Sequence, residues 1–245
     1  MNFANPVQTV DRILGGALPI VQPRTGYRFS VDALLLGRFA RAGRRDRVLE
    51  LGAGCGVVSV MLAAAHQPRE LIALEIQPEL AAMAARNFEL SNLRRCTARC
   101  GDLRDKLDGL EPASFDLIVS NPPFRAARRG RESPNESRRI ARGGGGATLR
   151  EFIAAASRYA RHGARIAIVF TAVRTAELIG ELRGHSLEPK RIRLVHPRLE
   201  LPASTILVEA RKGGGVEAVI EPPLILNRAP GGYGEEARTL LGCDG

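Results

Sequence analysis

A four-residue motif near the middle of the chain carries groups suited to binding an aromatic amine. This motif, here called the acceptor motif, consists of Asn121, Pro122, Pro123 and Phe124 and follows an apolar run at 115–120. An exocyclic amino nitrogen is a poor nucleophile because its lone pair is delocalised into the ring. The Asn121 side-chain oxygen and the Pro122 carbonyl oxygen can each accept one of its hydrogens, which aims the lone pair at a sulfonium methyl group. Phe124 can stack on the ring.

Catalysis at such a motif needs no strong base, because positioning and charge complementarity supply most of the barrier reduction. The alternative is purely structural. An asparagine and two prolines at the end of a strand can simply terminate it, since proline removes a donor and fixes φ.

A glycine-rich turn earlier in the chain could hold the methyl donor. The stretch 48–56 reads Val-Leu-Glu-Leu-Gly-Ala-Gly-Cys-Gly, an apolar run that enters a Gly-x-Gly-x-Gly turn. Glycine lets the backbone turn tightly and approach a ligand where a Cβ atom would clash. Val57 stands where the dinucleotide fingerprint has its last glycine, and tight strand-to-helix turns use glycine in any case. The residues expected to bind a cofactor here are Glu50, Gly52, Gly54 and Gly56.

Two carboxylates follow the next two predicted strands. Glu75 lies 23 residues after Gly52, where it can accept both hydrogens of a ribose diol. Asp102 follows the third strand and can accept a hydrogen bond from an adenine amino group. A solvated strand end and a turn-forming aspartate are the structural alternatives. Open α/β sheets bind ligands at the carboxyl edge of the strands, so we expect both acids beside the glycine turn.

The elements that must position these residues alternate between strands and helices. Such alternation indicates an α/β fold with a mostly parallel sheet and helices on both faces. The connection between the last two strands is too short for a parallel crossover, so these two should be antiparallel. We therefore predict seven strands with the last one reversed. The strands are expected at 47–51, 71–75, 95–99, 115–120, 165–170, 191–196 and 204–209, and the helices at 57–65, 78–92, 149–161 and 173–183.

The domain organisation predicted from composition has three parts. Residues 1–45 form an N-terminal extension or cap, with a helix at 31–39 and Ser30 as its N-cap. Residues 46–212 form the main domain. Residues 213–245 form a C-terminal extension that begins in a glycine run and includes an extra strand at 219–226. The segment 125–146 lacks apolar periodicity and contains four successive glycines, which indicates a loop.

The formal charge of +10 favours a polyanionic partner. Only three of the 36 basic residues are lysines, and such an arginine bias can also reflect genome composition. Seven arginines nevertheless cluster just after the acceptor motif: Arg125, Arg128, Arg129, Arg131, Arg138, Arg139 and Arg142. We expect them to contact phosphates of RNA without reading sequence, the alternative being a solvated loop. A base in an RNA loop is already partly unstacked, which favours it over duplex DNA.

The remaining composition points to a cytoplasmic protein without metal. The four cysteines have no Cys-x-x-Cys spacing and no zinc-ligand pattern, so free thiols and no metal site are expected. The N-terminus does not read as a secretory signal. No apolar stretch approaches the length of a membrane span.

These motifs together resemble the class I, small-domain methyltransferases that act on amino groups. Within that group the chain is most similar to the bacterial tRNA(Val) (adenine-N6)-methyltransferases, which modify the anticodon loop. The resemblance covers nearly the whole chain, and the motif Asn-Pro-Pro-Phe is more specific for the reaction than for the substrate. It extends beyond the motifs above to residues 11–16, 26–36, 194–197 and 207–213.

The resemblance implies a Rossmann-like fold, S-adenosyl-L-methionine as cofactor and tRNA as partner. It also implies that Ser30 and Asp32 help to enclose the cofactor, whereas composition alone makes them a helix cap and a first-turn acid. The chain departs from the family pattern at Gly143–146, where relatives carry polar side chains. This departure affects the expected positioning of the RNA.

Three other functions are compatible with parts of the pattern. The same chemistry could act on guanine N2 of ribosomal RNA or on a glutamine amide of a protein. However, the chain lacks the duplicated domain of many of the former. It also lacks the longer N-terminal domain and the tyrosine after the prolines that are typical of the latter. An RNA-binding protein with a degenerate cofactor pocket is disfavoured by intact Glu75, Asp102 and Asn121. NAD-dependent oxidoreduction is disfavoured by the glycine spacing.

Overall fold

The computed structural model describes residues 7–124, 147–227 and 232–241. Its main sheet has nine strands within these ranges, in the order β10-β8-β9-β7-β6-β3-β4-β5, with β11 paired to β8. The strands are β3 (Arg47–Leu51), β4 (Glu70–Glu75), β5 (Cys96–Cys100), β6 (Phe115–Ser120), β7 (Ala160–Thr171), β8 (Leu187–His196), β9 (Thr205–Lys212), β10 (Val219–Ile220) and β11 (Leu224–Ile225).

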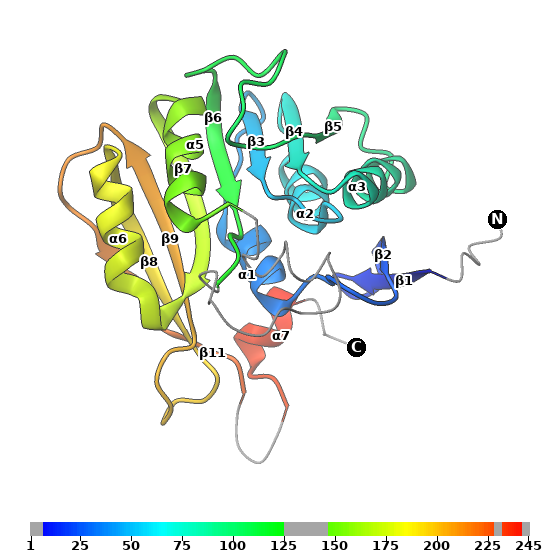
Figure 1. Cartoon of the computed structure of the whole chain (residues 1–245). Coiled ribbons are helices and arrows are strands. Elements are labelled where there is room, and N and C mark those ends of the chain that lie inside the picture. Colours follow the sequence, from blue (N-terminus) through cyan, green and yellow to red (C-terminus); the bar gives the residue numbers. More distant parts are fainter. Residues whose placement is uncertain (1–6, 125–146, 228–231, 242–245) are drawn as a thin grey trace, which may run out of the picture.

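Helices cover both faces of this sheet (Figure 1). One apolar core joins the sheet to α1 (Val31–Phe39), α2 (Val57–His66), α3 (Pro78–Leu90) and α7 (Glu235–Leu241). A second core joins the other face to α5 (Leu149–Tyr159) and α6 (Thr175–Gly184). Within β3, Val48 belongs to the first core, and Leu49 and Leu51 belong to the second. These three positions are apolar because a parallel strand is buried on both faces.

The strand directions agree with the prediction. β3, β4, β5, β6 and β7 run parallel to one another, and β9 runs antiparallel to both β7 and β8. The seven predicted strands are therefore present with one of them reversed. The expected strand at 219–226 is split into β10 and β11 around Pro222 and Pro223, and both short strands pair in parallel with β8. Proline cannot donate to a ladder, which accounts for the interruption.

Several boundaries differ from those predicted. The helix α5 ends at Tyr159 and β7 begins at once, so residues 160–164 belong to a strand. The strand β8 begins at Leu187, four residues early. Ser30 does precede α1, but its side chain caps no backbone N–H. The Ser30 hydroxyl instead donates to Asp32 at 3.3 Å.

An N-terminal hairpin is present that the sequence pattern did not predict. It pairs β1 (Gln8–Ile13) with β2 (Leu18–Pro23). Asn87 of α3 holds the hairpin through its buried amide, which accepts from Val21 N at 2.7 Å and donates to Val21 O at 2.9 Å. The same amide donates to Cys55 O at 2.9 Å. One side chain thus joins the hairpin to the glycine turn.

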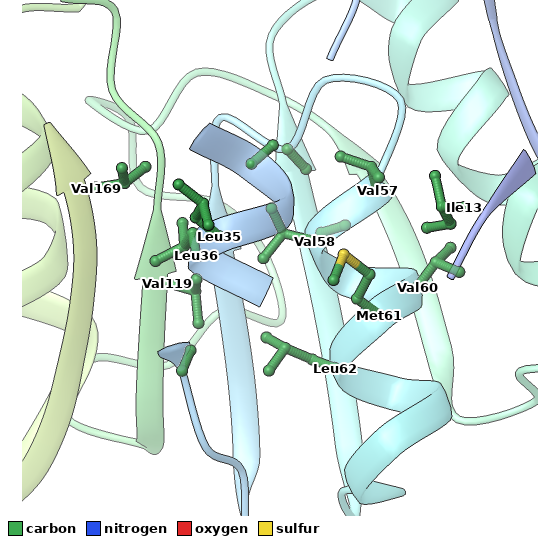
Figure 2. Close-up of a cluster of buried hydrophobic side chains, with 14 of the residues drawn as sticks. Ile13, Leu35, Leu36, Val57, Val58, Val60, Met61, Leu62, Val119 and Val169 are labelled. Atoms are coloured by element: carbon green, nitrogen blue, oxygen red, sulfur yellow. The ribbon is translucent and has the colours of Figure 1, made fainter. Parts of the chain in front are cut away.

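The core beneath the hairpin is formed by α1 and α2 (Figure 2). Leu35 and Leu36 of α1 lie beside Val58, and Ile13 of the hairpin lies near Val57 and Val60. Tyr27 and Phe29, between the hairpin and α1, pack against the same core.

Candidate active site

The carboxyl ends of β3, β4, β5 and β6 border one cavity of about 380 Å³, within the range of small-molecule sites. Parallel strands place the residues that follow them at a common edge, where ligands bind in open α/β sheets. Of the expected site residues that the structure describes, the cavity brings together all except Glu50 and Gly56. The lining residues from the expected set are Ser30, Asp32, Gly52, Gly54, Glu75, Asp102, Asn121, Pro122, Pro123 and Phe124.

The glycine turn has a backbone that side chains would not tolerate. Gly52 and Gly54 have φ values of +70° and +57°. A Cβ atom on Gly52 would lie 2.9 Å from the Phe152 ring, and one on Gly54 would lie 2.8 Å from the Tyr27 ring. The turn is fixed to β4 because Gly52 N donates to Leu74 O at 2.9 Å. These glycines therefore admit two aromatic walls from distant parts of the chain.

Glu75 lies at the end of β4, almost fully buried. Its Oε2 accepts from Gly54 N at 2.8 Å and its Oε1 accepts from Gln77 N at 3.0 Å. Burial raises the pKa of this carboxyl group, and the backbone hydrogen bonds oppose that rise. Each carboxylate oxygen has more than one acceptor direction, so Glu75 keeps capacity for hydroxyl donors from the cavity.

Asp102 also lines the cavity, but it already has a partner. Arg104 N donates to Asp102 Oδ1 at 2.9 Å, and the guanidinium forms an ion pair with the same carboxylate. The hydrogen bond from the Arg104 side chain lowers the pKa of Asp102. The carboxylate is therefore ionised at neutral pH and has two acceptor oxygens near the wall of the cavity.

The acceptor motif follows β6 directly. Ser120 Oγ donates to Leu51 O at 3.0 Å, which aligns the ends of β6 and β3. Within the described part of the chain the Asn121 side chain has no hydrogen-bond partner, so its amide is free to bind a ligand. The Phe124 ring packs edge to face against the Phe170 ring, with 5.6 Å between the ring centroids.

The segment before α1 closes another wall of the cavity. Asp32 Oδ1 accepts from Thr205 Oγ1 at 3.0 Å, which ties the start of α1 to β9. Tyr27 and Arg28 line the cavity beside Ser30 and Asp32. Arg28 forms an ion pair with Asp11 of the hairpin at 2.8 Å. The hairpin thus supports the wall from outside.

Sequence reasoning missed several lining residues, among them Tyr27, Arg28, Gln77 and Phe152. Tyr27 and Arg28 fall inside the segment 26–36, which carries part of the family resemblance, and this was the available signal. Phe152 had no local signal, because its role arises from a contact with Gly52 that depends on packing. Gln77 follows Glu75 by two residues and donates to it from its backbone N–H, a bond that its residue type does not reveal.

Glu50 and Gly56 lie behind the cavity wall. Glu50 is buried and accepts from Ser59 N at 2.9 Å and from the Ser59 hydroxyl. Burial raises the pKa of Glu50 to about 8. Gly56 packs against α3, where a Cβ atom would lie 2.9 Å from Ala84 Cβ. Both residues support the glycine turn from the side of α2 and α3.

Comparison with known proteins places this site in a family. The profile of the methyltransferase small domain matches residues 30–182, which is more than half of the chain. The chain belongs to this family. The methyltransferase activity, the S-adenosylmethionine cofactor and the Rossmann-like fold expected from the sequence are thereby confirmed. The matched region contains every cavity-lining residue of the expected set, from Ser30 to Phe124.

Relatives of this methyltransferase carry a more specific name. A tRNA1(Val) (adenine(37)-N6)-methyltransferase of Aeromonas hydrophila is 26% identical over 86% of this chain and 87% of its own. A protein of the same name from Flavobacterium johnsoniae is 27% identical over 81% of this chain and 85% of its own.

Solved structures share the fold. A predicted O-methyltransferase of Agrobacterium tumefaciens has a TM-score of 0.69 at 24% identity, over 85% of this chain and 94% of its own. TYW2 of M. jannaschii in complex with AdoMet has a TM-score of 0.58 at 13% identity, over 86% of this chain and 88% of its own.

Some expectations fall outside the described residues. The arginines at 125–142 and the glycines at 143–146 lie in the segment 125–146, and Cys243 lies in the segment 242–245. Cys55, Cys96 and Cys100 are free thiols. Across residues 7–124, 147–227 and 232–241, no cluster of three or more histidine, cysteine or acidic side chains could hold a metal ion. No helix in these same ranges has the length and apolar character needed to cross a membrane.

Proposed function

We propose that this methyltransferase transfers a methyl group to N6 of an adenine in the anticodon loop of a tRNA. The observation that carries the proposal is the Asn121 amide, which has no hydrogen-bond partner among the described residues and lies at the wall of the cavity that Glu75 and the glycine turn also line. The names of the relatives support the tRNA and the adenine. Such a substrate also implies a cytoplasmic protein.

The cavity has the groups that S-adenosylmethionine requires. Gly52 and Gly54 line the cavity without side chains, Glu75 can accept hydrogen bonds from the ribose hydroxyls, and Asp102 can accept one from the adenine of the cofactor. Ser30 and Asp32 close the side next to α1. The cofactor, when bound, supplies an electrophilic methyl group on a positively charged sulfur. The carboxylates around the cavity complement that charge.

The acceptor side of the site is formed by the residues that follow β6. Asn121 Oδ1 and the Pro122 carbonyl each accept one hydrogen of the target amine. This holds the nitrogen in one orientation and directs its lone pair into the cavity. Phe124 stacks on the base. Pro123 fixes the backbone between the Pro122 carbonyl, which binds the amine, and the Phe124 ring, which stacks on the base. Orientation of the amine is the main contribution of these residues to the rate.

The test is a nucleoside analysis. The protein is incubated with labelled S-adenosylmethionine and total RNA from a strain that lacks the gene, and the nucleosides are identified by mass. N6-methyladenosine in the tRNA fraction is the expected product. Labelled N2-methylguanosine, or label only in protein when a cell extract replaces the RNA, would instead assign the same chemistry to a different acceptor.

A further inference from the structure

The acceptor motif is not held by the sheet that precedes it. The ladder of β6 ends at Ser120, its last residue paired with both β3 and β7. Pro122 and Pro123 have no backbone N–H and cannot be tied down by donors of their own. Something other than strand pairing must fix the position of Phe124.

A side chain from the connection between β7 and α6 contacts Phe124. Arg174 lies between β7 and α6, and its Nη1 donates to the Phe124 carbonyl oxygen at 2.8 Å. Arg174 is not part of the cavity wall, whereas Phe124 is. The arginine therefore reaches the acceptor motif from behind.

Arg174 is itself fixed in orientation. Its Nε and Nη2 donate to the two carboxylate oxygens of Glu177 at 2.7 and 2.5 Å, which is the bidentate geometry that restrains a guanidinium most strongly. The hydrogen bond from Arg174 lowers the pKa of Glu177, so the pair is charged at neutral pH.

Phe170 connects the two partners. It is fully buried in β7, and the Arg174 guanidinium carbon lies 4.9 Å from the centre of its ring. The edge-to-face contact at 5.6 Å joins the same ring to Phe124. The ring of Phe124 and its carbonyl are thus both held, one by Phe170 and the other by Arg174.

We propose that Arg174 is a positioning residue of the acceptor site, which orders the end of the motif so that Phe124 presents its ring to the target base. The role of Phe124 as a stacking platform rests on the proposed function. The contact of Arg174 with Phe124 does not. Arg174, restrained by Glu177, donates a hydrogen bond to the Phe124 carbonyl and so fixes a segment whose two prolines have no N–H to donate.

The first test is kinetic and uses Arg174→Met, which keeps an apolar stem against Phe170 and removes the donors. We expect kcat to fall about tenfold, since small misplacements of a reacting group are costly. The dissociation constant for S-adenosylmethionine should change by less than about twofold, because Arg174 lies outside the cavity wall. Arg183→Met is the matched control. Arg183 lies on α6 and, like Arg174, pairs with an acid, Glu188, at 3.2 Å. It should leave both constants unchanged.

A double-mutant cycle separates positioning from a general structural role. In a Phe124→Ala background, Arg174→Met should have little further effect on kcat, because the group that it positions is gone. Additive losses in the cycle, or an equal loss of cofactor binding in Arg174→Met, would overturn the proposal.

A spectroscopic test needs no RNA substrate. The chain contains no tryptophan, so Phe124→Trp creates a single fluorescent reporter in the acceptor motif. Adding Arg174→Met should lower the steady-state anisotropy of this reporter, while adding Arg183→Met should not. Unchanged anisotropy would overturn the positioning role. If the wild-type protein fails to methylate tRNA while the anisotropy falls as expected, the substrate assignment is wrong and the role of Arg174 stands.

Discussion

At the scale of single residues, the site depends on polar groups whose neighbours leave them available. Asn121 has no partner among the described residues, while Glu75 and Asp102 keep acceptor capacity beyond the bonds that hold them. Glu50 is the opposite case, a carboxyl group whose bonds from Ser59 hold the glycine turn from behind. Residues of similar type in one stretch of sequence therefore lie in separate places, some lining the cavity and others supporting the glycine turn.

Replacement of Asn121 tests the acceptor side. Asn121→Ala removes one of the two oxygens that orient the amine, so kcat should fall by at least about 100-fold, as when one stabilising group is removed from other active sites. The affinity for S-adenosylmethionine, measured by calorimetry, should stay within a few-fold. Equal turnover by the variant and the wild type would remove Asn121 from the mechanism.

Glu50→Gln tests the buried carboxyl through its pH dependence. The pKa of Glu50 is raised from 4.5 to about 8 in the folded state. The protonated form therefore stabilises the fold fully below the unfolded pKa, and this contribution is lost as pH rises through about 8. The variant cannot ionise, so its Tm relative to the wild type should rise by about 5–10 °C between pH 5 and pH 9.

The matched control for that experiment is Glu79→Gln. Glu79 is an exposed acid in the first turn of α3. The Tm of the Glu79→Gln variant should follow that of the wild type at both pH 5 and pH 9. A Glu50→Gln curve that runs parallel to the wild type would show that Glu50 is ionised throughout and that another group balances its charge.

At the scale of elements, the hairpin and α3 act together on the cavity. Asn87 joins Val21 of β2 to the Cys55 carbonyl of the glycine turn, and Arg28 joins the cavity wall to Asp11 of β1. The hairpin is therefore a support for the cofactor site, although none of its strand residues lines the cavity.

Asn87→Leu tests this connection. The substitution leaves buried backbone groups of Val21 and Cys55 without partners, so the free energy of unfolding should fall by about 2–4 kcal/mol. Urea denaturation measures the loss. The affinity for S-adenosylmethionine should weaken as well, because the hairpin supports the wall at Tyr27. Glu89→Gln, at an exposed position on the same helix, is the comparison, and affinity should be retained there.

At the scale of the whole molecule, the net charge of +10 favours association with RNA. Binding through phosphate contacts weakens with salt because condensed counterions are released. The arginines after the acceptor motif were predicted to make such contacts, and this stays a prediction because they lie outside the described residues.

Salt dependence tests it directly. In a triple variant, Arg128→Gln, Arg129→Gln and Arg131→Gln together, the slope of log affinity for tRNA against log salt should be shallower by about 2–3. The control is Arg44→Gln, Arg45→Gln and Arg69→Gln. These exposed residues precede β3 and β4, at the opposite edge of the sheet. Equal slopes for the two triple variants would assign the salt dependence to the net charge alone.

The sequence by itself determined the strand order along the chain and the residues that follow each strand. The apolar runs, the glycine turn, Glu75, Asp102 and the acceptor motif were all local signals, and parallel strands carry such residues to one edge. This is why most of the expected site residues line the same cavity.

Only the tertiary structure decided which distant residues complete the site. Phe152 lies in a helix 100 residues after Gly52, and Tyr27 lies in a loop 27 residues before Gly54. Nothing in the sequence around either aromatic residue specifies its contact with the glycine. Arg174 reaches Phe124 from across β7, and Glu50 turns toward Ser59. Local periodicity fixes which face a side chain takes, but its partner on that face depends on how whole elements pack.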